Sequence, residues 1–89
     1  MRLSDAQQLL LQQLLDLPVL SPDEFLARWT LTYQDVSQIC CCSISTVEHW
    51  FAQGTGRRSP AASYQKLLAI TDFLLSNSDS VHTWRQFWQ

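Results

Sequence analysis

The 89-residue chain lacks the features that mark secreted, membrane-spanning or disulfide-stabilised proteins. No apolar run is long enough to span a bilayer. Its first residues lack the charged region, apolar run and small-residue cleavage site of a signal peptide. The three cysteines are consecutive, at positions 40 to 42, and an odd, clustered set cannot form a disulfide framework. We therefore expect a cytoplasmic protein that does not contact a membrane.

Residue patterns typical of enzymes and metal sites are also missing. The two histidines, His49 and His82, lie far apart in the sequence, the eight acidic residues are scattered, and no phosphate-binding loop is present. Three adjacent cysteines cannot all face one tetrahedral ion. We expect no enzymatic activity, no cofactor and no metal, with Cys40 and Cys42 in the core. A redox role for an exposed Cys41 is the alternative.

Positive and negative charges nearly balance in this chain. The net charge of −2 excludes a strongly basic protein that coats nucleic acid. The distribution is uneven, however, because residues 43–66 carry Arg57, Arg58 and Lys66 against Glu48 alone, whereas both flanking segments are acidic. The only basic segment coincides with the motif that carries the functional inference.

Apolar residues are abundant, at 46% of the chain, and they recur at helical spacing. Sustained apolar/polar alternation, which is typical of strands, does not occur. The length fits one domain over residues 1–89. A domain of this size buries only about 60–65% of the surface that its unfolded chain exposes. We predict an all-α fold, a compact bundle of about five short helices that contains a helix-turn-helix.

Capping residues mark the predicted helix starts. Ser4 or Asp5 begins a first helix that ends near Asp16, with Leu10, Leu14 and Leu17 on one stripe and Leu11 and Leu15 beside it. The second predicted helix starts at Ser21-Pro22, with a capping box to Glu24, and ends near Trp29; the third starts at Thr32, with a capping box to Asp35. The fourth starts at Ser43 and ends before Gly54, and a last helix starts at Val81 and ends at Trp88. The fifth starts at Ser59-Pro60 and reaches about Leu75, and the residues on one of its faces are Leu67, Leu68, Thr71, Leu74 and Leu75.

Residues 35–50 have the pattern of two short helices joined by a tight turn. Ser37 supplies the small residue that such a pair buries where the helices cross, and Val36 and Cys40 form the apolar face of the first helix. Cys42 fills the turn. The second helix has an apolar flank and a polar flank, and the polar one is narrow enough for a major groove about 12 Å wide. The apolar flank consists of Val47, Trp50 and Phe51.

This segment resembles the helix-turn-helix of bacterial and phage regulators of the Cro/repressor and Xre type. Their common pattern is Asp-Val-Ala-x-x-Leu-Gly-Val-Ser-x-x-Thr-Val-x-x-Trp/Leu, and it aligns without a gap with Val36, Cys42, Ser43, Thr46, Val47 and Trp50. The stretch from Trp50 to Pro60 is similar to their Trp-x-x-Gly-x-Arg-x-Pro. The resemblance covers about residues 31–75, with the helix-turn-helix at about 32–53. This chain departs from the pattern at Ser37, usually alanine, and at Cys41, usually a left-handed glycine.

The resemblance implies a sequence-specific double-stranded DNA-binding protein, a transcriptional repressor that inserts the helix Ser43–Gln53 into the major groove. The residues implied to contact bases are Ile44, Ser45, Thr46, Glu48 and His49. Those implied to contact the DNA backbone are Thr32, Gln34, Ser43, Arg57, Arg58 and Lys66. The alternatives are that Arg57 and Arg58 form a solvated loop, that His49 is ordinary surface, and that Glu48 has a structural or anti-specificity role.

Two apolar segments exceed what so small a core requires: the leucines of residues 9–20, and the group Trp84, Phe87 and Trp88. Both are most simply core, but we expect one of them to form a homodimer interface. The main rival to DNA binding is a protein-interaction module, in which either segment docks onto a partner protein, because a helix-turn-helix fold does not guarantee DNA contact. A subunit that brings a recombinase or transposase to DNA is a second rival.

Overall fold

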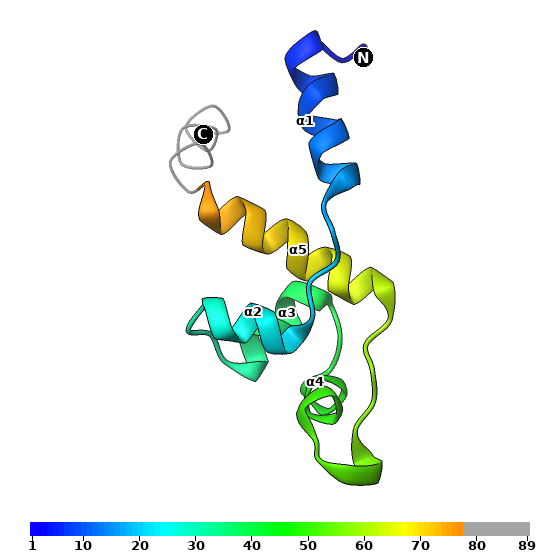
Figure 1. The fold of residues 1–89 in the computed structure, drawn as a ribbon, viewed down its shortest axis with the longest axis vertical. Coiled ribbons are helices and arrows are strands. Elements are labelled where there is room, and N and C mark those ends of the chain that lie inside the picture. The colour runs from blue at the N-terminus through cyan, green and yellow to red at the C-terminus, as the bar shows by residue number, and fades with distance from the viewer. Residues whose placement is uncertain (78–89) are drawn as a thin grey trace.

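The computed structural model describes residues 1–77, and the regular secondary structure of this part of the chain is all helical (Figure 1). Its elements are α1 (Asp5–Asp16), α2 (Pro22–Arg28), α3 (Tyr33–Cys40), α4 (Ile44–Phe51), the 3₁₀ turn η1 (Gly54–Gly56) and α5 (Ala62–Ser76). The predicted all-α bundle is confirmed. The helix predicted over residues 81–88, including Trp84, Phe87 and Trp88, lies outside the described residues.

Side-chain caps fix most of the helix starts. Capping boxes join Ser4 to Gln7 before α1 and Thr32 to Asp35 before α3, so both ends satisfy backbone N–H groups that have no partner within the helix. The Ser21 hydroxyl accepts from the N–H of Glu24 at 3.2 Å, as predicted. The other half of the predicted capping box, a hydrogen bond from the backbone N–H of Ser21 to the Glu24 side chain, is not formed.

The helix predicted to begin at Ser59-Pro60 begins instead at Ala62. The backbone is extended at Arg57 (φ −74°, ψ 137°) and at Ala61 (φ −62°, ψ 155°), which lets the chain cross from α4 to the start of α5. No side chain caps α5. The Gln65 amide holds the approach by donating to the carbonyl of Pro60 at 3.1 Å.

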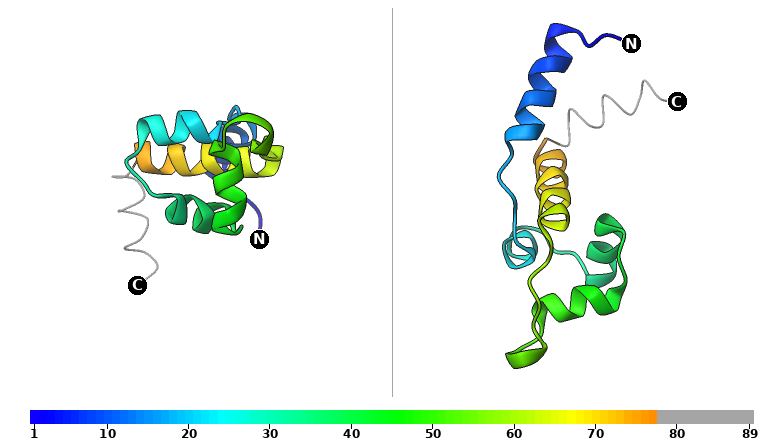
Figure 2. Two further views of the ribbon diagram at one scale, coloured as in Figure 1. Left: turned by 90° about the horizontal axis from the view of Figure 1, so that it is seen from below. Right: turned by 90° about the vertical axis from the view of Figure 1, so that its right-hand side faces the viewer.

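The core lies where α5 crosses α2 and α3, and α4 closes it from the other side of α3 (Figures 1 and 2). Helix α5 buries only part of the predicted face. Leu68 and Ala69 are buried, whereas Leu67, Leu74 and Leu75 are exposed. Asp72 explains the orientation, because its carboxylate accepts hydrogen bonds from Trp29 and Arg28 of the α2 end. The buried apolar residues are Leu20, Phe25, Val36, Cys40, Val47, Trp50, Leu68 and Ala69.

Helix α1 projects from this bundle and buries none of its residues (Figure 1; Figure 2, right). Of the leucines in residues 9–20, only Leu20 belongs to the core. The projection makes the molecule long, with extents of 48 × 25 × 22 Å and a radius of gyration of 15.2 Å. A compact domain of this length would have a radius of about 12 Å.

None of the helices in residues 1–77 combines the length and the apolar character that crossing a lipid bilayer requires.

Candidate nucleic-acid interface

Helices α3 and α4 form the predicted pair with a tight turn. Ser37 is buried at their crossing, where its hydroxyl donates to the carbonyl of Gln34 at 2.7 Å. The N–H of Cys42 donates to the carbonyl of Ser37 at 3.0 Å and closes the turn. Cys41, at the position where the resembling regulators have glycine, is left-handed, with φ 55° and ψ 43°. The turn therefore keeps its expected geometry in spite of the side chain.

The apolar flank of α4 fixes how the helix is turned. Val47 is fully buried and Trp50 is 4% exposed. The Trp50 ring lies 5.3 Å from the ring of Tyr64 on α5, and the half-buried Phe51 stacks on Tyr33 of α3 with ring centroids 4.8 Å apart. Packing on two neighbouring helices leaves α4 little freedom to rotate about its axis. The same contacts therefore also fix the direction that the opposite flank of α4 faces.

The opposite flank of α4 is open. Ile44 is 43% exposed, and Ser45, Glu48 and His49 are also exposed. Within residues 1–77 all four side chains remain exposed, and the described hydrogen bonds join only His49 to another segment, the turn at Gly56, so the structure brings most of the predicted base-contacting set onto one surface. We call it the α4 outer face: Ile44, Ser45, Glu48 and His49.

Thr46 differs from the other residues of the predicted base-contacting set. It is half-buried, and its hydroxyl oxygen lies 2.9 Å from the hydroxyl oxygen of Ser43. The Ser43 hydroxyl in turn accepts from the N–H of Thr46 at 3.1 Å. Both side chains thus belong to the N-terminal cap of α4, and their first task is to begin the helix.

The turn after α4 is tied back to that helix. The N–H of Arg58 donates to the carbonyl of His49 at 2.9 Å, and Nδ1 of His49 lies 3.3 Å from the carbonyl oxygen of Gly56. Gly54, with φ 72°, supplies the left-handed residue that starts this turn. Arg57 and Arg58 consequently have fixed positions at the C-terminal end of α4, next to the outer face.

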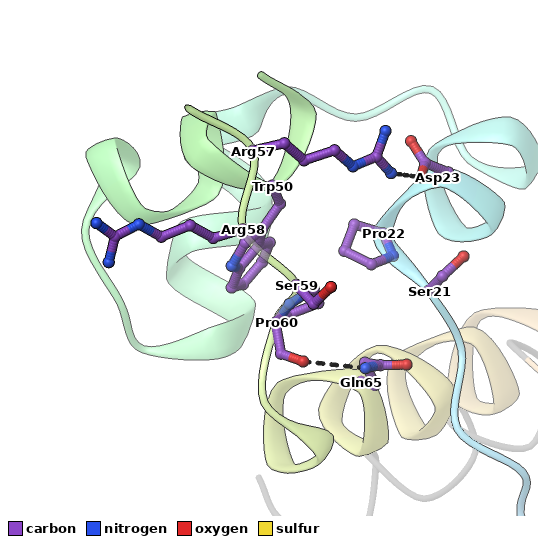
Figure 3. Close-up of a pocket in the computed structure, with 9 residues that line it drawn as sticks. All are labelled: Ser21, Pro22, Asp23, Trp50, Arg57, Arg58, Ser59, Pro60 and Gln65. Atoms are coloured by element: carbon purple, nitrogen blue, oxygen red, sulfur yellow. Dashed lines mark hydrogen bonds and ion pairs between the residues drawn. The ribbon is translucent and has the colours of Figure 1, made fainter. Parts of the chain in front are cut away.

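The two arginines point in different directions (Figure 3). Arg57 pairs with Asp23 at the start of α2, with a nitrogen–oxygen distance of 2.9 Å and both side chains more than half exposed. Arg58 extends the opposite way, and among the described residues it makes no ion pair. Between them lies an open hollow of about 240 Å³ that Trp50, Pro22 and Pro60 help to line. Arg58 is therefore the freer of the two cations.

Two predicted phosphate-contacting residues, Thr32 and Lys66, have other tasks. The Thr32 hydroxyl is used in the cap of α3, whereas the exposed Gln34 lies in the first turn of the same helix. The backbone N–H of Thr32 donates to the Asp35 carboxylate, which lowers the pKa of Asp35 and keeps a negative charge at this helix start. The Lys66 ammonium donates to carbonyls at the end of α1, those of Leu14, Leu15 and Leu17.

The cysteine triplet divides as expected from the sequence. Cys40 is buried and Cys42 is half-buried against the core, whereas Cys41 is exposed. Burial raises the pKa of the Cys40 thiol to about 11, and to a smaller degree it raises the pKa of Cys42. Both thiols therefore stay protonated at neutral pH.

Sequence reasoning missed two ties that shape this region. Asp23 pairs with Arg57 across 34 residues, and no local pattern indicates such a contact. Lys66 binds the end of α1 from α5. The only available indication was that Lys66 is the sole lysine and that α1 has no basic residue of its own in its last turn.

Comparison of this chain with models of protein families, with curated proteins and with solved structures finds no match.

Proposed function

We propose that this protein binds double-stranded DNA by placing α4 in the major groove and acts as a sequence-specific transcriptional repressor in the cytoplasm. One observation carries the proposal. The apolar flank of α4 is buried against α3 and α5, while the side chains of the α4 outer face remain exposed. An exposed helix flank of this width fits the groove, and the resemblance to Cro and Xre regulators supports the same orientation.

The α4 outer face carries the chemistry needed to read base edges. The Ser45 hydroxyl can donate to or accept from any base, and Ile44 can pack on a thymine methyl group. The Glu48 carboxylate accepts from cytosine N4, and it repels the backbone wherever no such donor is present. His49 can present Nε2, because its Nδ1 faces the carbonyl of Gly56. Thr46 contributes at the rim of the face, next to the cap.

Backbone contacts come mainly from the basic turn. Arg58 has no ion pair among residues 1–77, and its N–H is bonded to the carbonyl of His49, a residue of the outer face, so its guanidinium can reach a phosphate next to that face. Arg57 can join it, because an exposed pair such as Arg57–Asp23 is worth only about 0–1 kcal/mol. Ser43, Thr32 and Gln34 supply neutral polar groups at two helix starts. We leave Lys66 out of the DNA-binding set, because α1 carbonyls surround its ammonium.

Selection from a random duplex pool with the full chain tests the proposal, since it measures binding and sequence preference together. We expect an enriched motif of a few base pairs per copy. A salt titration on the selected duplex should show log K falling against log salt by about 0.9 per neutralised phosphate. An unenriched pool together with salt-independent or undetectable binding would contradict the proposal.

A protein-interaction module is the second candidate function, and one observation favours it. Leu9, Leu10, Leu11 and Leu15 of α1 are all more than 40% exposed, which offers a partner protein an apolar helix. This candidate predicts no duplex binding at low salt. The same titration therefore distinguishes it from the first.

A further inference from the structure

We propose that α1 is an association helix, and that the α1 of a second copy of this chain covers its apolar face. This face, which we call the α1 seam, consists of Leu10, Leu11, Leu14 and Leu15 together with Leu17, the residue that follows the helix as its C-cap. Leu10, Leu11 and Leu15 are 46, 44 and 63% exposed, and Leu14 and Leu17 are half-buried.

Helix α1 needs a covering surface to be stable. It has 12 residues and none of them is buried. Isolated helices of about 12–15 residues are marginal in water even when their residues favour helix formation. A capping box at its start and Lys66 at its end are the ties that the described contacts provide. These hold the ends of α1, but they leave Leu10, Leu11 and Leu15 exposed to water.

The seam has the spacing of a helix-pairing surface. Gln7, Leu10, Leu14 and Leu17 alternate by three and four residues, which keeps one stripe facing a partner helix. Leu11 and Leu15 widen the stripe on one side. The charged residues of α1, Asp5 and Asp16, fall on the opposite flank by the 100° rotation per residue, and so does Leu9.

The residues beside the seam favour an identical helix as the occupant. On α1 they are Gln8 and Gln13, which are neutral, and α1 contains no basic residue. The charged group at the end of the seam is the Lys66 ammonium of α5, which already donates to the carbonyls of Leu14, Leu15 and Leu17. A charged partner would therefore find no opposite charge on these flanks of α1. Glutamine amides both donate and accept hydrogen bonds. In a pair of α1 helices, leucines can therefore pack against leucines, and glutamine amides can bond to glutamine amides.

The size of the seam sets the expected strength of association. A 12-residue helix is about 18 Å long, so the seam covers less than the roughly 800 Å² per partner of a standard interface. We expect a dimer that dissociates at micromolar concentration. The interface does not depend on DNA binding. Only its consequence, that two copies of α4 meet successive half-sites about 34 Å apart, rests on the proposed function.

Sedimentation equilibrium of the full chain without DNA tests the inference. We expect twice the 10.3 kDa chain mass at tens of micromolar. Leu15→Lys should raise the dissociation constant roughly tenfold or more, because association buries two lysines. Leu9→Lys is the matched control: its side chain has the same 63% exposure but lies off the seam, and the constant should stay within about twofold.

Leu11→Ala is a second variant that removes apolar area without lowering helix propensity. It should also weaken the dimer. A wild-type chain that stays monomeric throughout this range, or equal effects of Leu15→Lys and Leu9→Lys, would overturn the inference and point to another occupant. Duplex binding is measured separately on Leu15→Lys. A monomeric variant that still binds one half-site shows that DNA binding does not need the α1 interface. A wild-type dimer that binds no duplex contradicts the proposed function and leaves the α1 interface standing.

Discussion

The backbone N–H of Arg58 donates to the carbonyl of His49 at 2.9 Å, and this bond attaches the basic turn to the end of α4. The bond uses backbone atoms only, so it is kept when either side chain is changed. A substitution at position 58 therefore tests the charge of the guanidinium and leaves the placement of α4 intact. A change of the His49 ring keeps this backbone bond but removes the contact of Nδ1 with the carbonyl of Gly56.

We predict that Arg58→Ala weakens binding to duplexes of every sequence and lowers the salt slope by about 0.9, the value for one lost phosphate contact. Arg57→Ala should have a smaller effect, because Asp23 already holds that guanidinium. Arg28→Ala is the matched control, since Arg28 is similarly exposed and paired, but with Asp72 on α5. Fluorescence anisotropy at several salt concentrations measures all three. An Arg58→Ala slope equal to that of the wild type would contradict the docking.

Ser45 and Thr46 are predicted to respond differently to substitution. Ser45→Ala removes an exposed hydroxyl that makes no hydrogen bond within the described part of the chain, so the preferred sequence should change while the melting temperature does not. Thr46→Val keeps the N–H that Ser43 caps but removes the hydroxyl bonded to Ser43, and it should cost about 0.5–1.5 kcal/mol of stability, the value of one hydrogen bond. Selection from a random pool and thermal unfolding report the two effects. Identical selected motifs for wild type and Ser45→Ala would remove Ser45 from the base-contacting set.

Local chemistry made most of the fold predictable from the sequence. Each of the capping residues Ser21, Thr32 and Ser43 accepts a hydrogen bond from the residue three positions later. Such a cap can be recognised from four consecutive residues of the sequence. The face of α4 followed from the spacing of Val47, Trp50 and Phe51. Of the predicted base-contacting residues, only Thr46 turned toward the cap, a choice that depends on one side-chain rotation.

The features that the sequence could not indicate are contacts between distant parts of the chain. The leucines of α5 divide between core and solvent according to where Asp72 meets Trp29, 43 residues away, and periodicity cannot show this. Lys66 looked like a phosphate ligand because of its charge and position, but it lies against the end of α1. Leucines at helical spacing in α1 indicate an amphipathic helix, but they do not indicate whether the covering surface belongs to the same chain.

Lys66→Met is predicted to loosen α1 without affecting DNA binding. The variant keeps most of the apolar stem and removes the three donors to the carbonyls of Leu14, Leu15 and Leu17. Hydrogen bonds from a charged group contribute about 1.5–3 kcal/mol, so amide hydrogen exchange in α1 should accelerate, whereas that in α3 and α4 stays the same. Lys66→Arg is the control that keeps a cationic donor. A reduced salt slope in Lys66→Met would show that Lys66 contacts phosphate after all.

The three thiols should react in an order set by burial. Cys41 is exposed and should be alkylated first at pH 8, before the half-buried Cys42 and the buried Cys40. Because the pKa of Cys40 is raised to about 11 from 9.0, the folded state holds its proton more tightly than the unfolded state. Stability should therefore fall as pH rises from about 9 to about 11. Mass-mapped alkylation and urea unfolding across this range test both points, and Cys40→Ala should show a flatter decline. Faster labelling of Cys40 than of Cys41 would contradict the burial.

Cys41→Gly is predicted to stabilise the protein. The residue at this position has φ 55° and ψ 43°, a left-handed conformation that costs a residue with a Cβ atom about 1–2 kcal/mol. Glycine removes this strain, but its greater freedom in the unfolded chain costs about 0.5–1 kcal/mol, so the net gain should be up to about 1.5 kcal/mol. Thermal unfolding should show a rise of about 4–8 °C for each kcal/mol gained in a domain of this size. Cys41→Ala separates strain from thiol chemistry, because alanine lacks the sulfur but keeps the Cβ atom. If Cys41→Gly melts no higher than Cys41→Ala, the turn is not strained at this residue, and the departure from the glycine of Cro and Xre regulators costs this chain nothing.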